Sequence, residues 1–428
     1  MKKGDYYYAG SDNGLSESEI CAAVRASLEG LNLKRVLIIP PDFTRFHSNA
    51  GLITNICYGL LTGSGCEVDI LPAVGTHAPI NRDEAALMFG DIPFGRFIAH
   101  NWRTDVVKIG TVPAEFIREI TEGLWSESID VQVNRLIMDK RYDLVISTGQ
   151  VVPHEVAGMA NHSKNIFVGI GGSDMINKSH MVGALYGLER VMGKDHTPVR
   201  KIFDYCSERF LAGRPILYAL TVCASQGGGS KTLGLFIGRG RDVFERAVEL
   251  SREKNIDYVE TGIKKCVVFL DPAEYKSTWL GNKAVYRTRM AVADGGSLLV
   301  LAPGVRRFGE DGQVDRMIRK YGYSGRINIL EQLMKDENRD LRENMSAAAH
   351  LIHGSSDGRF SITYAIKEIA EDEITKVHYN AVGFDEAAKK YDPCKLSYGL
   401  NTMAGGEEIF FIPNPALGLW INREKFHT

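Results

Sequence analysis

Short apolar, β-branched runs alternate with segments of helical spacing along the first half of the chain. The runs have the composition of strands that are buried on both faces, as in a parallel sheet. Ser16 and Glu19 form a capping-box pattern at the start of the first helical segment, and Gly30 ends it. The predicted strands are residues 36–39, 68–71 and 144–147, and the predicted helices are residues 16–30 and 49–63.

The alternation continues beyond a glycine-rich segment that begins at Gly227. This segment lacks the GxxxxGKS or GxxxxGKT spacing of a phosphate loop, so we expect a hairpin there instead. A new strand start at Lys265 places a change of domain near residues 255–265. The remaining predicted strands are 233–237, a run that starts at Gly295, 374–379 and 409–412, and the remaining helical segments are 180–193, 241–254, 274–293, 305–350 and 384–391.

This order of strands and helices is typical of the α/β class. We expect two α/β domains, a larger N-terminal one over residues 1–260 and a smaller C-terminal one over residues 261–409. The C-terminal tail, about 410–428, is a segment that can pack back onto the first domain. A pocket between domains is the usual arrangement, so we expect the functional site in the cleft between the two.

Polar side chains follow each of the three predicted strands of the first domain. Asp42 and Arg45 come after the first strand, His77 after the second and His154 after the third. Ligands of open α/β sheets bind beyond the carboxyl ends of the strands, so these residues are candidates for one site. The stretch 149–180 adds His162, Lys164 and His180 among several glycines. Histidine changes charge near neutral pH and binds metals, and a deprotonated lysine is a nucleophile.

Composition excludes several classes of protein. The 428 residues carry a net charge of −2 without a basic block, so we expect no nucleic-acid partner. No apolar run approaches the roughly 20 residues that span a bilayer, and no apolar segment follows the N-terminal lysines, so we expect neither a membrane span nor a signal peptide. The seven cysteines are scattered without a CxxC pair, which favours reduced thiols and a cytoplasmic location.

Five motifs in a fixed order resemble the lactate racemase family, whose enzymes use a nickel-pincer nucleotide. The first two are a DxTR motif, Asp42-Phe43-Thr44-Arg45, and a GxH motif, Gly75-Thr76-His77. The third is the PHxxxG segment, Pro153-His154-Glu155-Val156-Ala157-Gly158. Lys164 follows ten residues after His154, and His180 follows sixteen residues after Lys164. The resemblance covers nearly the whole chain, and it makes the N-terminal domain the cofactor-binding and catalytic one.

The resemblance implies a role for each matching residue. Lys164 would carry the cofactor covalently, and His180 would ligate nickel, for which a square-planar site is suitable. His77 and His154 would be the acid/base pair. Arg45 would bind the substrate carboxylate through its planar guanidinium. Asp42 and Thr44 would support the cofactor or orient Arg45, and Gly158 would allow close approach of the backbone to the cofactor.

This inventory suits inversion at C2 of a 2-hydroxy acid. The C2–H proton is poorly acidic, and hydride transfer to the cofactor avoids a carbanion. A base is then needed for the hydroxyl proton of each enantiomer, and two histidines meet that need near neutral pH. The intermediate is a 2-keto acid, which must rotate before the hydride returns.

Two departures from the family pattern bear on the cofactor loop and on the substrate. Family members often have a GFSGGxK-like run before the lysine, whereas Asn161 and His162 replace its two glycines here. Lactate-specific members carry a YQxxK segment, and this chain has Tyr275-Lys276-Ser277-Thr278-Trp279. Tyr275, Lys276 and Trp279 are therefore the candidate substrate-binding residues of the second domain. The change argues against lactate, and stacking on Trp279 would fit a sugar acid.

The leading hypothesis is thus an isomerase, a nickel-pincer-nucleotide-dependent racemase or epimerase of a 2-hydroxy acid, with an aldonate such as gluconate as favoured substrate. A simple acid such as malate or an aromatic lactate is the first alternative. Zinc-dependent hydrolysis by the same histidines and a non-catalytic nickel or cofactor carrier are the others, although no HExxH motif is present. The expected partners are the small-molecule substrate and the cofactor-biosynthesis proteins that load the enzyme.

Overall fold

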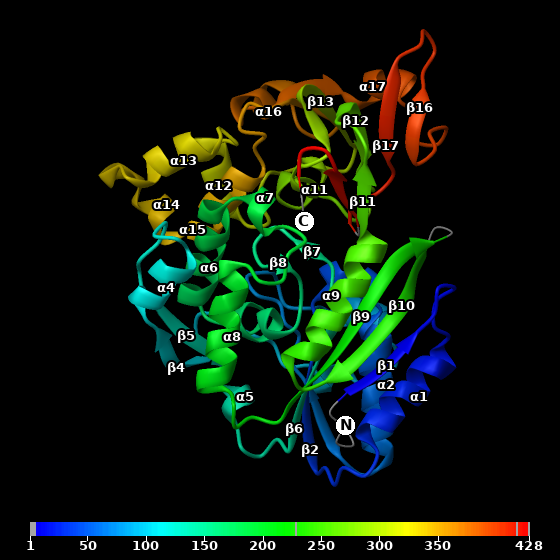
Figure 1. The fold of residues 1–428 in the computed structure, drawn as a ribbon, viewed down its shortest axis with the longest axis vertical. Helices are drawn as coiled ribbons and strands as arrows, with labels where there is room; N and C mark the ends of the chain where they lie inside the picture. Colours follow the sequence, from blue (N-terminus) through cyan, green and yellow to red (C-terminus); the bar gives the residue numbers. More distant parts are fainter. Residues whose placement is uncertain (1–5, 227–228, 417, 427–428) are drawn as a thin grey trace. The chain divides into compact units, whose positions relative to one another are not determined.

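The computed structural model describes residues 6–226, 229–416 and 418–426. The chain divides into two compact units (Figure 1). The first consists of Met1–Val182 and Met192–Asn255. The second consists of Gly183–Val191 and Ile256–Thr428.

The first unit differs from the continuous 1–260 domain that we expected, because residues 183–191 belong to the second unit. Polar contacts within the second unit account for the difference. The backbone oxygen of Leu185 accepts a hydrogen bond of 2.6 Å from Arg326, and Glu189 pairs with Arg289 at 2.6 Å.

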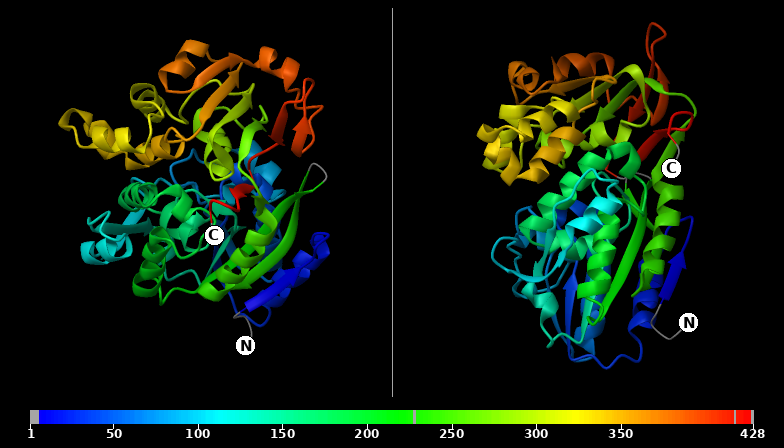
Figure 2. Two further views of the ribbon diagram at one scale, coloured as in Figure 1. Left: turned by 45° about the horizontal axis from the view of Figure 1, so that its top comes forward. Right: turned by 60° about the vertical axis from the view of Figure 1, so that its left-hand side comes forward.

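The first unit is built on a six-stranded sheet with the order β1-β10-β9-β6-β2-β3. The four strands from β9 to β3 are parallel, and β10 and β1 extend this sheet as an antiparallel edge. Figure 2 shows β9, β10 and β1 side by side. The strands are β1 (Tyr6–Gly10), β2 (Arg35–Ile39), β3 (Glu67–Ile70), β6 (Leu144–Gln150), β9 (Ile216–Gln226) and β10 (Gly229–Gly238).

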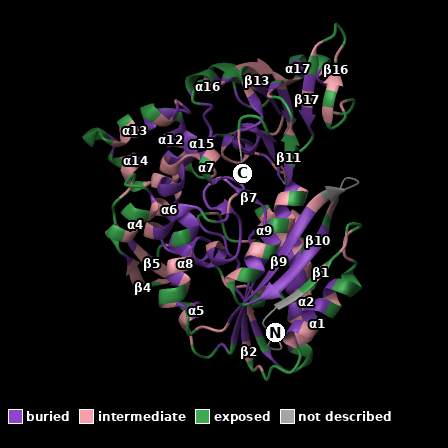
Figure 3. Ribbon diagram, in the orientation of Figure 1, coloured by how far each residue is buried: buried purple, intermediate pink, exposed green. Residues whose placement is uncertain are grey.

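Alternate residues of the sheet pack into two different cores. In β2, Leu37 and Ile39 face the core formed with α8 (Pro198–Phe210) and α9 (Arg241–Asn255). Val36 and Ile38 face the opposite core, formed with three helices. These helices are α1 (Glu17–Leu28), α2 (Ala50–Gly63) and α3 (Arg82–Phe89). The central strands are therefore buried on both faces, as their β-branched runs indicate (Figure 3).

The first predicted helix is confirmed with its cap. Ser16 accepts a hydrogen bond from the backbone of Glu19, and the Glu19 carboxylate accepts one from the backbone of Ser16. The remaining elements of the first unit surround the sheet. They are η1 (Phe43–Ser48), η2 (Phe94–Arg96), β4 (Val106–Val112), α4 (Ala114–Ile120), β5 (Ile129–Asn134), α5 (Arg135–Met138), β7 (Pro153–His154), β8 (Gly158–Met159), η3 (Asn165–Gly169) and α6 (Ser173–Tyr186), whose last turn enters the second unit.

The strand order places a topological switch point between β2 and β6. From β2 the chain moves to β3 on one side, and it later returns to β6 on the other side. The connections leave opposite faces at this point, so a crevice opens beyond the carboxyl ends of the two strands. The segments after β2, β3 and β6 are those that carry the candidate polar residues.

The second unit is also an α/β structure, with a mostly parallel sheet of order β15-β14-β13-β12-β17-β16. Its strands are β12 (Ile263–Phe269), β13 (Val292–Ala302), β14 (Ser361–Ile366), β15 (Asn380–Gly383), β16 (Gly399–Thr402) and β17 (Glu408–Ile412), and a separate pair is β11 (Ile256–Val259) with β18 (Leu419–Asn422). Its helical elements are α7 (Leu188–Val191), α10 (Thr278–Gly281), α11 (Lys283–Thr288), α12 (Gly312–Tyr321), α13 (Arg326–Leu333), η4 (Asp336–Asn338), α14 (Arg339–Glu343), α15 (Met345–His353), α16 (Glu371–Lys376) and α17 (Phe384–Lys390). The chain is thus an α/β protein of two units, as predicted.

The predicted strand at 374–379 is wrong. Residues Glu371–Lys376 form the helix α16, and the strand β15 follows it. Three acidic residues occupy the first turn of α16, where they stabilise the positive end of the helix dipole. Lys376 pairs with Asp372 one turn earlier at 2.7 Å. These local charges outweigh the β-branched pattern of the segment.

Two further expectations for the second unit differ from the structure. The helix over 274–293 is only the two short helices α10 and α11, because β13 already begins at Val292. The tail 410–428, which we left outside the second domain, contributes strands to the second unit, since β17 pairs with β12 and β18 pairs with β11. We predicted no element over the segment that forms β14.

The predicted hairpin after residue 226 is formed by β9 and β10, although Gly227 and Gly228 lie outside the described residues. Among the helices that the structure describes, none is both long and apolar enough to cross a membrane.

Candidate functional site

The segment after β2 carries the DxTR motif on a single helical turn. Asp42 caps η1, because its Oδ1 accepts hydrogen bonds from the Thr44 backbone at 3.0 Å and the Thr44 hydroxyl at 2.6 Å. Asp42 is buried and Thr44 is exposed. The sequence folds in this way because an aspartate oxygen satisfies the first free N–H groups of a turn.

Asp42 also holds His77, which follows β3. The Nδ1 of His77 lies 2.5 Å from the second oxygen of Asp42. Gly75, two residues earlier, has a φ of +56°, and its N–H donates to Gly169 at 2.8 Å, which fixes the loop. Burial disfavours ionisation of Asp42, but the neighbouring His77, the Thr44 hydroxyl and the charge of Arg45 together lower the pKa of Asp42 below its usual value. Asp42 is therefore an ionised anchor for the histidine.

Asp42 offers a direct test of this anchor. We expect Asp42→Asn to lower kcat by roughly 10–100-fold, as removal of an orienting partner commonly does, with no change in the far-UV circular dichroism spectrum. Asp91→Asn is the matched control, since the Asp91 carboxylate accepts a surface amide hydrogen bond from Asn55 at 2.8 Å and has no contact with the site residues named above. Equal rates for Asp42→Asn and the control would show that the Asp42–His77 contact does not assist turnover.

Arg45, the last residue of the DxTR motif, differs from Asp42 and Thr44 in its contacts. Its guanidinium forms no hydrogen bond or ion pair with any residue that the structure describes, and it is half-buried. Its charge nevertheless acts on both Asp42 and Lys164, so it lies near them. A planar cation with free donors is suited to a carboxylate ligand.

The segment after β6 forms a small hairpin of β7 and β8. His154 and Gly158 face each other in this hairpin, and both are buried. The Nδ1 of His154 accepts a hydrogen bond from the Val156 backbone at 3.1 Å and lies 3.6 Å from the carboxylate of Glu155. The Val156 contact favours the tautomer of neutral His154 with the proton on Nε2.

Lys164 is fixed at the switch point by the residue that follows it. The side-chain amide of Asn165 donates to the backbone oxygen of Ile39 in β2 and to the hydroxyl of Ser147 in β6, both at 3.1 Å. Lys164 therefore lies beyond the carboxyl ends of these two strands. Within the described part of the chain, its ammonium has neither a hydrogen bond nor an ion pair.

Burial of Lys164, followed by the charge of Arg45, lowers its pKa to about 8 from 10.5. The carboxylates of Glu155 and Asp42 oppose the shift, and Arg200 adds to it. A substantial share of the amine is thus neutral near pH 8, which is the nucleophilic form.

His180 lies on α6 and presents one ring nitrogen to the site. Its Nδ1 donates to the backbone oxygen of Ile176 at 2.6 Å, which leaves Nε2 with the lone pair. Burial, followed by the charge of Lys164, lowers the pKa of His180 to about 4, so the ring is neutral near pH 7. A neutral imidazole whose other nitrogen donates to a carbonyl is the usual form of a metal-binding histidine.

The structure brings five of the first-unit candidates together, namely Asp42, Arg45, His77, Lys164 and His180. Lys164 is affected by the charges of Arg45 and Asp42, and His180 by those of Lys164 and His77. Glu155 acts on both Lys164 and His180 and was not singled out from the sequence. Its position inside the PHxxxG motif, next to His154, was the available signal.

The three candidates for substrate binding lie in the second unit. Tyr275 is fully buried and its hydroxyl donates to Asn414 at 3.1 Å, which favours a structural role. The ammonium of Lys276 donates to the backbone oxygen of Pro272. Trp279 stacks on His350 with ring centres 3.9 Å apart and is half-buried. Their roles toward a substrate stay predictions.

His162 differs from the other histidines of the stretch. It is buried, and its ring packs on Tyr218 at 3.9 Å and Phe244 at 5.1 Å. Neither ring nitrogen has a hydrogen-bond partner with good geometry among the described residues. Burial and the charges of Arg200 and Arg241 hold its pKa well below the usual value, so His162 stays neutral and acts as a packing residue.

His162→Phe should therefore keep the fold and reduce its acid sensitivity. The unfolded histidine binds a proton below about pH 6.5 whereas the folded one does not, so this group costs stability as the pH falls. We expect the variant to recover about 1–2 kcal/mol of the stability that the protein loses between pH 8 and pH 5. Unfolding by denaturant at both pH values measures the difference, and an unchanged loss would contradict the burial of a neutral ring.

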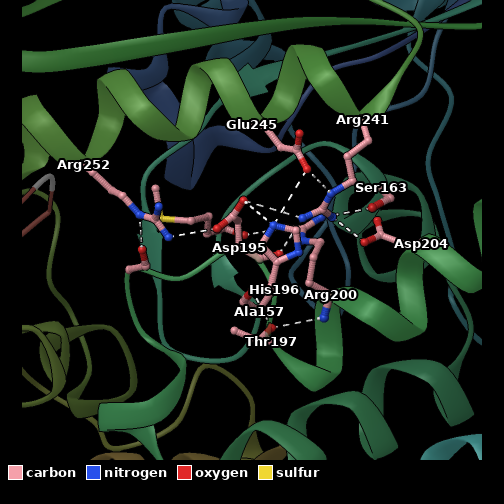
Figure 4. A network of polar contacts seen from close by, with 12 residues as sticks. Ala157, Ser163, Asp195, His196, Thr197, Arg200, Asp204, Arg241, Glu245 and Arg252 are labelled. Atoms are coloured by element: carbon pink, nitrogen blue, oxygen red, sulfur yellow. Dashed lines mark hydrogen bonds and ion pairs between the residues drawn. The ribbon is translucent and has the colours of Figure 1, made fainter. Parts of the chain in front are cut away.

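A second group of metal-binding side chains lies outside this site. Within the described ranges, the ligand atoms of Asp195, His196 and Glu245 are close enough to share an ion. Both carboxylates are already paired, because Arg252 lies 2.9 Å from Asp195 and Arg241 lies 3.1 Å from Glu245 (Figure 4). The side chain of His196 is 68% exposed. These arginines make the group an ion-pair network rather than a metal centre.

The fold and the site define a doubly wound α/β domain with a lysine and several histidines at its switch point. Residues 21–191 match the lactate racemase N-terminal domain. Residues 21–191 therefore form a lactate racemase N-terminal domain, and the predicted resemblance to this family is confirmed over that range.

Two solved structures have a similar fold. A crystal structure of a Thermotoga maritima protein is 24% identical, with a TM-score of 0.81 over 96% of this chain and 99% of that one. The lactate racemase apoprotein from Thermoanaerobacterium thermosaccharolyticum is 17% identical, with a TM-score of 0.68 over 95% of this chain and 93% of that one. No curated protein matches the sequence.

Proposed function

We propose that the protein is a nickel-pincer-nucleotide-dependent racemase or epimerase that inverts C2 of a 2-hydroxy acid. The observation that carries the proposal is the presence of Lys164 and His180 at the same site. The pKa of the Lys164 amine is about 8, and the amine makes no hydrogen bond or ion pair with a described residue. His180 is neutral, and its Nδ1 donates to the backbone oxygen of Ile176, so Nε2 carries the lone pair. A covalent tether and a metal ligand need these two forms.

The residues present fit the cofactor. Lys164 would hold it through Nζ, His180 would hold nickel through Nε2, and the buried Gly158 would let the backbone approach it. When bound, the nickel-pincer nucleotide supplies the acceptor for the hydrogen that leaves C2. The remaining steps fall to side chains of this chain.

Arg45 would bind the substrate carboxylate, since its guanidinium has donors to spare and lies near Lys164. His77 and His154 would each take the hydroxyl proton from one enantiomer and return it to the other. His154 would take it on Nδ1, and the hydrogen bond from the Val156 backbone would open in that step. Asp42 would keep His77 in place and stabilise its protonated form. Removal of hydride from C2 and of a proton from the hydroxyl gives the 2-keto acid, and their return to the opposite face completes inversion.

The favoured substrate is a sugar acid such as gluconate. This preference rests on Lys276 and Trp279, which stand where lactate-specific members have glutamine and lysine. The indole of Trp279 is half-buried and retains exposed surface that could stack on a sugar. Malate or an aromatic lactate is the alternative, and a higher kcat/KM for either than for the aldonates would favour it.

Retention of the C2 hydrogen tests the hydride step. Cofactor-loaded protein would be incubated in ordinary water with a 2-hydroxy acid deuterated at C2, and the inverted product analysed by mass spectrometry. We expect the deuterium to remain at C2, because the same hydrogen returns. Exchange for protium during inversion would show deprotonation instead and would reject hydride transfer.

Loading would require the cofactor-biosynthesis proteins as transient partners, and we propose that it takes place in the cytoplasm. Metal analysis of the loaded protein separates this proposal from zinc-dependent hydrolysis. Nickel in the protein is the expected result, and zinc alone would favour the hydrolytic alternative.

A further inference from the structure

The loop that leads into Lys164 has an unusual backbone. Asn161 and His162 both have left-handed conformations, with φ of +64° and +57°. Glycine adopts this region freely, and other residues do so at a cost. These are the positions where the resemblance led us to expect glycines. Asn161 offsets part of this cost itself, because its Oδ1 accepts a hydrogen bond from the His162 backbone at 2.6 Å. Groups outside the loop contribute further contacts.

Arg200 makes the contacts that stabilise it. This arginine of α8 is completely buried, and its guanidinium donates to the backbone oxygens of Met159 at 2.5 Å and Asn161 at 3.3 Å. It also donates to the hydroxyl of Ser163 at 3.0 Å (Figure 4). All three acceptors belong to the five residues that precede Lys164.

The first turn of α8 contacts the beginning of the same loop. The hydroxyl of Thr197 caps α8 by accepting from the Arg200 backbone at 3.2 Å. The same hydroxyl donates to the backbone oxygen of Ala157 at 3.2 Å (Figure 4). The helix α8 therefore contacts the loop 157–163 at both of its ends, through Thr197 at Ala157 and through Arg200 at Ser163.

Arg200 is also a buried cation without a counter-ion. Its guanidinium forms no ion pair with a residue in the described ranges, because the nearby Asp204 is paired with Arg241 instead. Phe244 lies under the guanidinium at 4.3 Å. Burial lowers the pKa of Arg200 to about 10, so it stays charged near pH 7. An unpaired buried charge is costly, and its hydrogen bonds are concentrated on this one loop.

We propose that Arg200 is a positioning residue for Lys164, holding residues 159–163 in the conformation that presents the lysine amine to the site. The assignment rests on the proposed function only in that Lys164 is the tether. Arg200 also acts through its charge, which lowers the pKa of Lys164 and so favours the neutral amine. Geometry and charge thus both prepare Lys164 for a covalent bond.

The test uses the full chain without cofactor and acetic anhydride as the probe. Acylation of Lys164 would be followed against pH by peptide mass spectrometry, and amide hydrogen exchange of residues 159–163 would be measured in parallel. The variants are Arg200→Met, which removes charge and hydrogen bonds, and Arg200→Lys, which keeps the charge but loses the planar fork. Arg214→Met is the matched control, since Arg214 donates to the backbone oxygen of Asp139 in the same unit.

For Arg200→Met we expect the midpoint of Lys164 acylation to rise by about one pH unit from about 8, and exchange of the loop amides to accelerate at least tenfold. Arg200→Lys should accelerate exchange while moving the midpoint less. The control should change neither. A midpoint and exchange rates equal to those of the unmodified protein would overturn the proposal, and if Arg200→Met does not fold, unchanged exchange in Arg200→Lys overturns it.

Neither readout depends on substrate or on racemisation. If the loaded enzyme inverts no hydroxy acid but Arg200→Met still shifts Lys164, the proposed function fails and the assignment of Arg200 stands. If inversion occurs and the shift is absent, the reverse holds.

Discussion

His77→Ala is expected to lower kcat by about 10²–10⁴-fold while the protein keeps its full nickel content and its Lys164 adduct. The histidine is held by the buried carboxylate of Asp42 at 2.5 Å, and it contributes to the electrostatic environment of His180. Loss of its side chain removes a proton acceptor but no ligand of the cofactor. The measurements are steady-state rates in both directions, metal analysis and intact mass.

His196→Ala is the matched control for His77→Ala. His196 is an exposed histidine of the same unit whose nearest partner is the Asp195 carboxylate at 3.4 Å. We expect it to retain full turnover and full nickel. Turnover that survives in His77→Ala would refute the acid/base assignment, and a non-catalytic carrier would show no turnover in any variant.

Lys164→Met is expected to abolish the covalent adduct and to lower turnover by about 10⁴-fold or more, because no other group at the site can form the tether. Intact mass and chiral product analysis measure the two effects. Lys201→Ala removes an exposed lysine from the same unit and should leave both unchanged. An adduct of the same mass on Lys164→Met would place the tether elsewhere.

The same substitution should stabilise the cofactor-free chain. The pKa of Lys164 is about 8 when folded and near 10.5 when unfolded, so the unfolded state binds the proton more tightly. The resulting cost is complete below pH 8 and disappears as the pH rises toward 10.5. We expect Lys164→Met to gain about 1–3 kcal/mol of stability at pH 7 and less at pH 10, as measured by denaturant unfolding. A loss of stability at pH 7 would contradict the desolvation of the amine.

Much of the first unit was predictable because its central strands are buried on both faces. Continuous β-branched runs such as residues 36–39 have few alternatives to a parallel strand, and the polar residues after them then share one edge. The pairing of β2 with β3 and β6 gives this result in the structure. The predicted ends of the three strands were sufficient to select Asp42, His77 and His154 as candidates for one site.

Local charges and long-range contacts account for what was missed. The segment 374–379 has a strand-like composition, yet its first three residues end the helix Glu371–Lys376, which the acidic first turn stabilises. Arg200 lies 36 residues beyond Lys164, so no motif connects the two. One signal was available, because Arg200 lies between Val199 and Ile202 on the buried side of α8. A charged residue in an apolar stripe indicates a buried partner.

Chiral analysis of a substrate panel tests directly whether the protein inverts C2 of a 2-hydroxy acid. Protein shown to carry nickel and an adduct on Lys164 would be incubated separately with single stereoisomers of gluconate, malate, an aromatic lactate and lactate. We predict that at least one acid, and gluconate first, becomes a mixture of its two C2 configurations. Unchanged configuration of every acid in the presence of fully loaded protein would contradict it.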